Sequence, residues 1–561
     1  MLTAGQILEL VKSLIWLLAG VGIFIVGMNF MSSALEKSAG SGMKKLLGKI
    51  SNNRFSGVGI GAGVTAIIQS SSATSVMVIG LVNAGAMTLM QATPIIMGAN
   101  IGTTVTGVLV ALKNDYFNLA MYLLAFVGVM MGFAKNEKVK TIGSLFCGLG
   151  LIFVGLNIMS SKQAFKNPLI EEMFINIFKV VDFPLLLILI GVIFTALIQS
   201  SSAATGVVIT MVGANILPLD LALFIVLGAN IGTCVTALLA SLGATENAKR
   251  VALIHFTFNF IGTVLFTIII WIFKDFVVDL LVSIFPNDND PMSLQMRVSL
   301  FHVIFNVSTT LLLLPFVKLL VKYSCLVIKD KKKGEELTLK FVDDRLTSMP
   351  SVALMQVKKE VEYMLLLVEK NVENSLEVIR TGDTQKGKMV KENEKIINFT
   401  NSALTKFLIK LSSSASQSDE KVIGSYFHVL NDLERIGDHA ENFYEIGVQM
   451  KKSGLSFSEA AKDELREMYE KVFEMFDIAV SAFDNLSTEH LSELTAKENE
   501  VDSLKKKLNA AHVTRLASGD CAMDHSPYFF SAVAGLERVA DHLVNVGYSI
   551  VNPTGSQSVK A

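Results

Sequence analysis

The chain has 561 residues, of which 51% are hydrophobic, and its formal net charge at pH 7 is −1. Its mean hydropathy of +0.51 is too high for an ordinary soluble protein, so a wholly soluble fold is excluded. The balanced charge gives no sign of a nucleic-acid partner, and none is predicted. The scattered cysteines, three of them in apolar runs, indicate neither a disulfide framework nor a thiolate metal site: Cys147, Cys234, Cys325 and Cys521.

Charged residues are distributed very unevenly along the chain. Phe55–Leu112 contains no Asp, Glu, Lys or Arg, and Phe183–Thr245 contains only Asp220. After about Lys329 the sequence becomes charged and amphipathic. This division predicts a membrane domain over residues 1–328, a charged linker over 329–344 and a soluble domain over 345–550.

Apolar runs long enough to cross a bilayer predict seven membrane spans, at 13–33, 88–112, 116–134, 139–161, 217–242, 250–274 and 297–323. The first run continues the repeat pattern described below and follows Glu9 and Lys12. We therefore expect it to be a span and not a cleaved signal.

A polar motif occurs twice inside this apolar sequence. Thr65–Ser72 reads TAIIQSSS and Thr195–Ser202 reads TALIQSSS, while Gly98–Thr106 reads GANIGTTVT and Gly228–Thr236 reads GANIGTCVT, all at an offset of 130. Two short helices meeting at each QSSS would form a re-entrant hairpin, over 57–84 and 185–214. The GANIGT runs are expected to break their helices, because non-helical backbone at membrane depth must line a cavity or be buried.

The repeat extends further towards the N-terminus. Gly22–Ser33 (GIFIVGMNFMSS) matches Gly150–Ser161 (GLIFVGLNIMSS), which places the repeats at about 13–134 and 140–274, followed by the further span 297–323. Three crossings lie between the two starts, so the repeats are predicted to be inverted. The basic loop Glu36–Arg54 is assigned to the cytoplasm and the balanced loop Lys162–Asp182 to the outside, which puts the soluble domain in the cytoplasm.

A third duplication lies near the end of the membrane domain. Arg250–Asn259 and Arg297–Asn306 both fit R-V-x-L-x-H-x-x-F-N, with His and Asn on one helix face. Two interpretations stay open: hydrogen bonds that hold the helices together, or a part in proton or substrate coupling.

Uncharged polar groups can bind ions within a membrane at tolerable cost. Ser hydroxyls and free backbone N–H groups at a helix start suit an oxyanion, whereas carbonyl, hydroxyl and amide oxygens suit sodium. Several oxyanions, among them phosphate, sulfate and arsenate, fit this chemistry. Small residues that merely permit close helix packing are the competing interpretation, which the duplication at identical spacing disfavours.

The paired QSSS motifs, each followed by GANIGT, resemble the type II sodium–phosphate cotransporter family over about residues 13–325. That resemblance implies sodium-dependent transport of inorganic phosphate through a site formed by the two QSSS repeats. On this sequence the implied substrate and sodium ligands are Gln69, Ser70, Ser71, Ser72, Gln199, Ser200, Ser201 and Ser202, with Thr65, Thr195, Asn100, Thr103, Asn230 and Thr233 as secondary candidates.

The soluble domain carries its own repeat. Glu434–Asn442 (ERIGDHAEN) matches Glu537–Asn545 (ERVADHLVN), and helical patterning predicts two three-helix units. The repeated E-R-[IV]-x-D-H pattern resembles the PhoU domain, an all-helical regulator of phosphate signalling that binds metal through such carboxylates. A divalent or iron ion would then be held by Glu434, Asp438, Glu537, Asp541 and Asp502, although Asn398 stands where a partner acid of Asp502 is expected.

The predicted fold is therefore all-α: a polytopic membrane domain of two inverted repeats with re-entrant hairpins, plus a cytoplasmic six-helix PhoU-like bundle. The predicted function is sodium-dependent phosphate transport in the cell inner (plasma) membrane, with lipid around the chain and phosphate and sodium as its ligands. A phosphate exporter and a phosphate-sensing membrane receptor are the alternatives, and an enzyme is not expected. A homo-oligomer and a phosphate-signalling protein partner both stay open.

Overall fold

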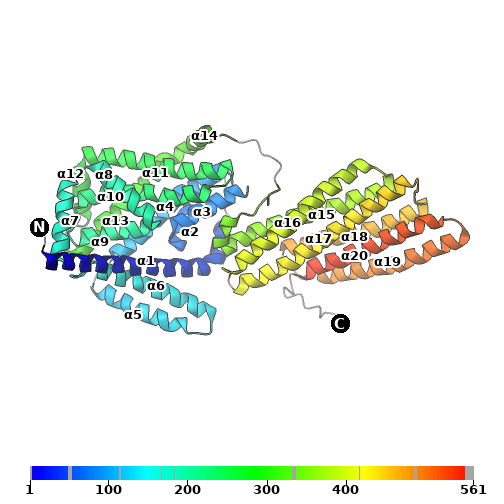
Figure 1. The fold of residues 1–561 in the computed structure, drawn as a ribbon, viewed down its shortest axis with the longest axis horizontal. Helices are drawn as coiled ribbons and strands as arrows, with labels where there is room; N and C mark the ends of the chain where they lie inside the picture. The colour runs from blue at the N-terminus through cyan, green and yellow to red at the C-terminus, as the bar shows by residue number, and fades with distance from the viewer. Residues whose placement is uncertain are drawn as a thin grey trace. The chain divides into compact units, whose positions relative to one another are not determined.

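The computed structural model describes residues 3–47, 53–112, 115–165, 167–181, 183–330, 337–415, 417–485 and 489–549, and in these ranges every regular element is a helix (Figure 1). The chain divides into two compact units, Met1–Lys332 and Lys333–Ala561. The predicted all-α fold is confirmed. Residues 331–336 of the predicted linker, 48–52 of the predicted inner loop and Asp182 lie outside the described residues.

The first unit contains long apolar helices interleaved with short ones. The long helices are α1 (Ala4–Leu47), α4 (Leu89–Ala111), α6 (Glu137–Met159), α10 (Leu219–Ser241), α11 (Glu246–Ile272) and α13 (Pro291–Leu313). The shorter helices are α2 (Arg54–Ile68), α3 (Ser71–Asn83), α5 (Asp115–Gly132), α7 (Pro168–Val180), α8 (Pro184–Ile198), α9 (Ser201–Gly213), α12 (Lys274–Ile284) and α14 (Val317–Val327).

Six helical stretches of the described residues are long and apolar enough to cross a membrane: Ala4–Ser38, Leu89–Ala111, Glu137–Met159, Leu219–Ser241, Glu246–Ile272 and Pro291–Val327. Each coincides with a predicted span. The seventh predicted span, 116–134, falls on α5, which is apolar but shorter. Helix α6 packs along both α1 and α5 (Figure 1).

The two QSSS segments form helix–turn–helix hairpins, α2–α3 and α8–α9, as predicted. Each hairpin's first arm packs along the GANIGT helix of its own repeat, α2 on α4 and α8 on α10. The same packing is thus built twice from sequences 130 residues apart.

The prediction that the GANIGT runs break their helices is wrong, since α4 and α10 run through them without interruption. The glycines instead allow close contact with the hairpin arms. A Cβ atom at Gly98 would overlap the carbonyl oxygen of Val58, and one at Gly228 would overlap that of Ile188. The glycine signal therefore reports backbone-to-backbone packing.

The third duplication joins helices through its arginines. Arg297 Nε and Nη2 donate to the carbonyl oxygen of Phe285 at the end of α12, at 2.9 and 2.7 Å. Arg250 Nε and Nη2 donate in the same way to Ile328 beyond the end of α14, at 3.0 and 2.7 Å. A cation at a helix C-terminus satisfies its free carbonyls and complements its dipole, so each copy caps a short helix that follows the other copy.

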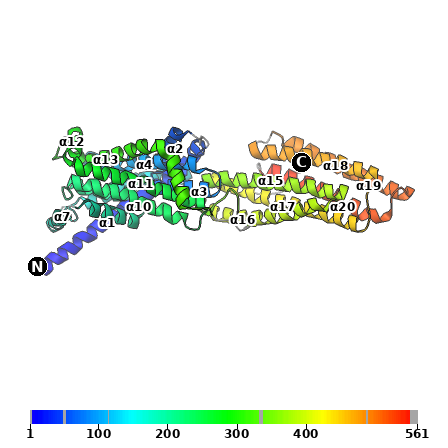
Figure 2. The same cartoon turned by 90° about the horizontal axis from the view of Figure 1, so that it is seen from above.

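The second unit contains six long helices within its described residues: α15 (Pro350–Thr381), α16 (Thr384–Ser412), α17 (Gln417–Lys452), α18 (Glu459–Asn485), α19 (Leu491–Ser518) and α20 (Ser526–Tyr548). They form two three-helix groups, α15–α17 and α18–α20, which pack together through α17 and α20 (Figure 2). The predicted six-helix bundle is confirmed.

Candidate functional site

Both QSSS segments adopt the same backbone turn. Gln69 and Gln199 end their first arms in the left-handed conformation, with φ of 59° and 58°. Ser70 and Ser200 follow with φ of −144°, and their hydroxyls accept hydrogen bonds from Ala73 and Ala203 N–H as N-caps of the second arms. The repeated Q-S therefore encodes a helix stop and a helix start in adjacent residues.

The two hairpins meet across the repeats, because α3 packs on α10 and α9 packs on α4. Ser202 Oγ lies 3.5 Å from Thr106 Oγ1, and Thr236 Oγ1 donates to Ser72 Oγ at 3.2 Å. Thr106 and Thr236 occupy equivalent positions in the two GANIGT helices. Each QSSS turn thus contacts the helix of the other repeat through a pair of hydroxyl groups.

The turns differ in how they are closed. Gln69 is buried, and its Oε1 accepts a hydrogen bond from Thr106 Oγ1 at 2.7 Å, whereas Gln199 is exposed. Thr65 donates to Thr74 Oγ1 at 2.9 Å, but Ala204 stands in place of Thr74 in the second repeat. The buried Thr195 hydroxyl therefore has no hydrogen-bond partner among the described residues.

The predicted polar residues of the GANIGT helices do not all join the QSSS turns. Thr103, Asn230 and Thr233 bond to carbonyls of their own helices: those of Ala99, Val226 and Ala229. Asn100 Nδ2 instead donates to Asn259 Oδ1 at 3.4 Å. Asn259 Nδ2 lies 3.4 Å from Cys234 Sγ, so this α11 residue links α4 to α10.

Thr106 and Thr236 are candidate site residues that the sequence-based prediction missed, whereas the bonds of Asn259 to Asn100 and Cys234 agree with the interhelical interpretation of the third duplication. Thr106 and Thr236 close the duplicated GANIGTTVT and GANIGTCVT motifs at the common offset of 130, which was the available signal. Only the crossing of the two repeats shows that these hydroxyls reach the turns of the opposite repeat.

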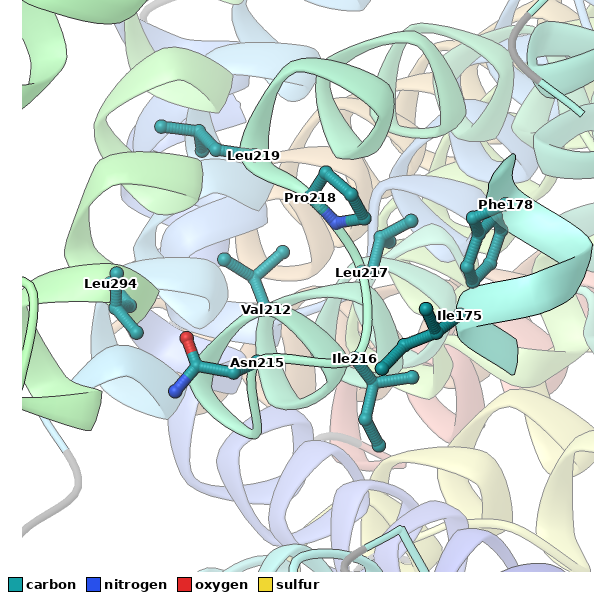
Figure 3. Close-up of a pocket in the computed structure, with 9 residues that line it drawn as sticks. All are labelled: Ile175, Phe178, Val212, Asn215, Ile216, Leu217, Pro218, Leu219 and Leu294. Atoms are coloured by element: carbon teal, nitrogen blue, oxygen red, sulfur yellow. The ribbon is translucent and has the colours of Figure 1, made fainter. Parts of the chain in front are cut away.

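A mostly apolar pocket of about 270 Å³ lies elsewhere in this unit, between α7, the α9–α10 turn and the start of α13. Figure 3 shows its lining, in which Asn215 is the only polar side chain. None of the predicted substrate or sodium ligands lines it. The polar contacts at the QSSS turns, and not this pocket, identify the candidate site.

In the second unit, the carboxylates of the first E-R-I-x-D-H repeat surround Glu394. Burial, together with Asp438, Glu441 and Glu434, raises the pKa of Glu394 to about 7. Both carboxylate oxygens of Glu394 are buried, and hydrogen bonding by the Asn398 side chain offsets only part of the rise in its pKa. Burial and Asp438 also raise the pKa of Glu434.

The second E-R-V-x-D-H repeat has a corresponding cluster of acidic side chains, around Glu498, but a lysine lies beside it. Burial and the neighbouring acids Asp502, Asp541 and Glu537 raise the pKa of Glu498. Here Lys505 Nζ lies 2.9 Å from Glu537 Oε1, which places a positive charge beside these acids.

No group of three or more His, Cys, Asp or Glu side chains in the described ranges is arranged to hold a metal ion. The predicted metal ligands, Glu434, Asp438, Glu537, Asp541 and Asp502, therefore stay a prediction.

Each of the two units matches a known protein family. The Na+/Pi-cotransporter family matches residues 23–161 and 162–276, and the PhoU domain matches 361–447 and 465–550. The protein YqeW of Bacillus subtilis is 32% identical over 308 residues, which span 55% of this chain and 96% of that protein. YjbB of Salmonella typhimurium, whose name assigns it provisionally to inorganic phosphate export, is 24% identical over 96% of this chain and 97% of its own length.

Two further matches cover parts of the chain. The sodium-dependent phosphate transport protein 2A of Rattus norvegicus is 22% identical over 43% of this chain and 59% of that protein. The crystal structure of PhoU from Pseudomonas aeruginosa, at 24% identity and a TM-score of 0.34, covers 36% of this chain and 96% of its own. The chain belongs to the Na+/Pi-cotransporter family, a family of transporters and not of enzymes, and carries a PhoU domain after its membrane helices.

Proposed function

We propose that this protein is a sodium-coupled transporter of inorganic phosphate, in which the two QSSS turns together form the substrate site. The observation that carries this proposal is the exchange of contacts between repeats, Ser202 with Thr106 and Ser72 with Thr236. A site formed at the interface of two related halves is common among transporters that work by alternating access.

The second arms of the hairpins supply the anion-binding groups. Helices α3 and α9 both begin at QSSS, so their first N–H groups and the Ser71 and Ser201 hydroxyls lie at a helix N-terminus. Free N–H groups and the positive end of the helix dipole favour an oxyanion such as phosphate.

Sodium would be held by the oxygen atoms around the same turns. The candidates are the Gln69 and Gln199 side chains, the carbonyls that end α2 and α8, and the hydroxyls of Thr65 and Thr195. The Thr195 hydroxyl has no hydrogen-bond partner among the described residues, and Gln199 is exposed. The second turn therefore has more oxygen atoms free to bind sodium than the first.

Transport outward is a second candidate function of the same site. The similarity to YjbB extends over 96% of this chain and includes the PhoU domain. Because the gradients of sodium and phosphate decide the direction of flux, uptake and export need no difference in the residues of the site.

We place the PhoU-like domain in the cytoplasm, where it would adjust transport to internal phosphate. The basic residues Lys37, Lys44 and Lys45, which the structure places in the last turns of α1 and not in a loop, support this orientation through the positive-inside bias. We also propose that the protein lies in the plasma membrane, where its membrane helices contact lipid. A homo-oligomer and a phosphate-signalling protein remain candidate partners.

Flux of radiolabelled phosphate in proteoliposomes, with sodium gradients imposed in either direction, tests the function. We expect flux that follows the sodium gradient and that is reduced by Ser71→Ala with Ser201→Ala. Binding of phosphate without flux would support a receptor instead.

The matched control is Ser144→Ala with Ser283→Ala, two exposed hydroxyls that bond only to carbonyls of their own helices. Its flux should equal that of the wild type. Equal flux from the QSSS double variant would exclude the proposed site.

A further inference from the structure

One face of α13 carries a row of buried polar side chains that the QSSS site does not use. Gln295, Ser299, His302, Asn306 and Thr309 are spaced by four and three residues, so they lie along a single helix face. All five are at most 2% exposed. With a rise of about 1.5 Å per residue, the row extends over roughly 21 Å.

These side chains are short of hydrogen-bond partners. Among the residues that the structure describes, nothing bonds to Gln295 Oε1, Ser299 Oγ, either ring nitrogen of His302, Asn306 Oδ1 or Thr309 Oγ1. A buried polar atom left without a partner costs about 1–3 kcal/mol, so a dry row of this length would be a severe penalty.

The row passes directly beside the candidate site. A Cβ atom at Gly107 would lie 3.5 Å from Ser299 Oγ and 3.7 Å from His302 Nδ1. Gly107 follows Thr106, whose hydroxyl contacts Gln69 and Ser202. Ser299 and His302 therefore pack beside Gly107, one residue along α4 from Thr106, through which the two repeats meet.

In the related helix α11, the asparagine of the same motif forms hydrogen bonds to neighbouring helices. Asn259 bonds to Asn100 and Cys234, and thereby holds α4 and α10 together. Its counterpart Asn306 donates only to the His302 carbonyl of its own helix. Interhelical bonding therefore accounts for Asn259 but not for Asn306, while both histidines of the motif keep a buried ring nitrogen without a partner among the described residues.

We propose that the polar face of α13 binds a chain of water molecules that runs through the core of the membrane unit and passes beside Gly107, the residue next to Thr106. A buried water makes about three hydrogen bonds and requires polar neighbours, and this face offers them at every turn of the helix. In the transport cycle, a role that rests on the proposed function, the chain supplies water to ions entering and leaving the QSSS site.

Hydroxyl-radical footprinting of the whole protein in water enriched in ¹⁸O tests the chain directly. Radicals formed from bound water label the side chains that touch it. His302 should be labelled and should acquire ¹⁸O although it is 1% exposed. Phe301, on the same helix and also 1% exposed, is the matched control because it packs edge-on against Phe266. Equal protection of His302 and Phe301 would overturn the proposal.

Two neighbouring threonines provide a second measurement. Thr310 Oγ1 bonds to the Met97 carbonyl at 3.4 Å, whereas Thr309 Oγ1 has no protein partner in the described residues. If Thr309 binds water, Thr309→Val should lower the melting temperature, as we expect Thr310→Val to do through the loss of its bond to Met97. A rise for Thr309→Val would mean that the row is dry.

Neither measurement depends on transport. Absence of phosphate flux with labelled His302 would reject the proposed function and keep the water chain. Sodium-driven flux with a protected His302 would support the proposed function and reject the water chain.

Discussion

At the scale of single residues, the two repeats contact each other near the QSSS turns through the side-chain pairs Thr106–Ser202 and Thr236–Ser72. Replacing Thr106 by Val keeps its shape but removes the hydroxyl from Gln69 and Ser202. At about 1–3 kcal/mol for each buried partner lost, we expect a ~5-fold or larger loss of apparent phosphate affinity. Concentration-dependent flux would measure it, with Thr93→Val as a control that loses only a bond to its own helix.

Glu394 predicts a pH dependence of stability in the second unit. Its pKa in the folded state, about 7, lies above the value of 4.5 that is usual for a glutamate exposed to water. The folded state therefore retains the proton longer than the unfolded state, so Glu394 should reduce stability as the pH rises from about 4.5 to about 7. Calorimetry of the protein with chelator present should show a smaller decline for Glu394→Gln. An unchanged pH profile would contradict this assignment.

At the scale of elements, the glycines of the hairpin arms predict a sharp contrast within α2. A Cβ at Gly61 would overlap the Ile95 carbonyl of α4, whereas one at Gly59 would meet nothing within 4 Å. Gly61→Ala should separate α2 from α4, reduce flux and lower stability by roughly 1–3 kcal/mol. Gly59→Ala should be neutral or slightly stabilising, because alanine favours helix. Thermal melting and flux of the two variants, side by side, check this.

The same elements show what sequence can and cannot predict. Hydropathy and the duplicated QSSS predicted the hairpins, because a turn between two short apolar helices is encoded locally. The GANIGT runs were misjudged because glycine signals either a break or a close approach, and only the packing of α2 on α4 and α8 on α10 distinguishes them. Thr106 and Thr236 were missed because their partners lie 96 and 164 residues away in sequence.

At the scale of the whole molecule, the inverted topology expected from the sequence makes a prediction that is independent of transport. Single cysteines at Ser41 and Asn167, in a chain without its four native cysteines, should react with impermeant reagents from opposite sides of the membrane. Ser41 lies in the last turns of α1, and Asn167 caps α7 of the second repeat. Reaction of both from one side would refute the inversion.

The division into two units predicts that transport and its regulation can be separated. All QSSS and GANIGT residues, and the arginine caps at Phe285 and Ile328, lie within Met1–Lys332. The hydrogen bonds described for the site join residues of the first unit to one another, so a chain ending at Lys332 should still move phosphate in proteoliposomes. The domain can bias the transporter only through a difference in its interaction with the inward- and outward-open states. Its removal should therefore change the rate, or the response to internal phosphate, while the sodium dependence persists. A truncated protein that stays monodisperse and retains its helical content but has no flux would show that the domain is part of the transport machinery.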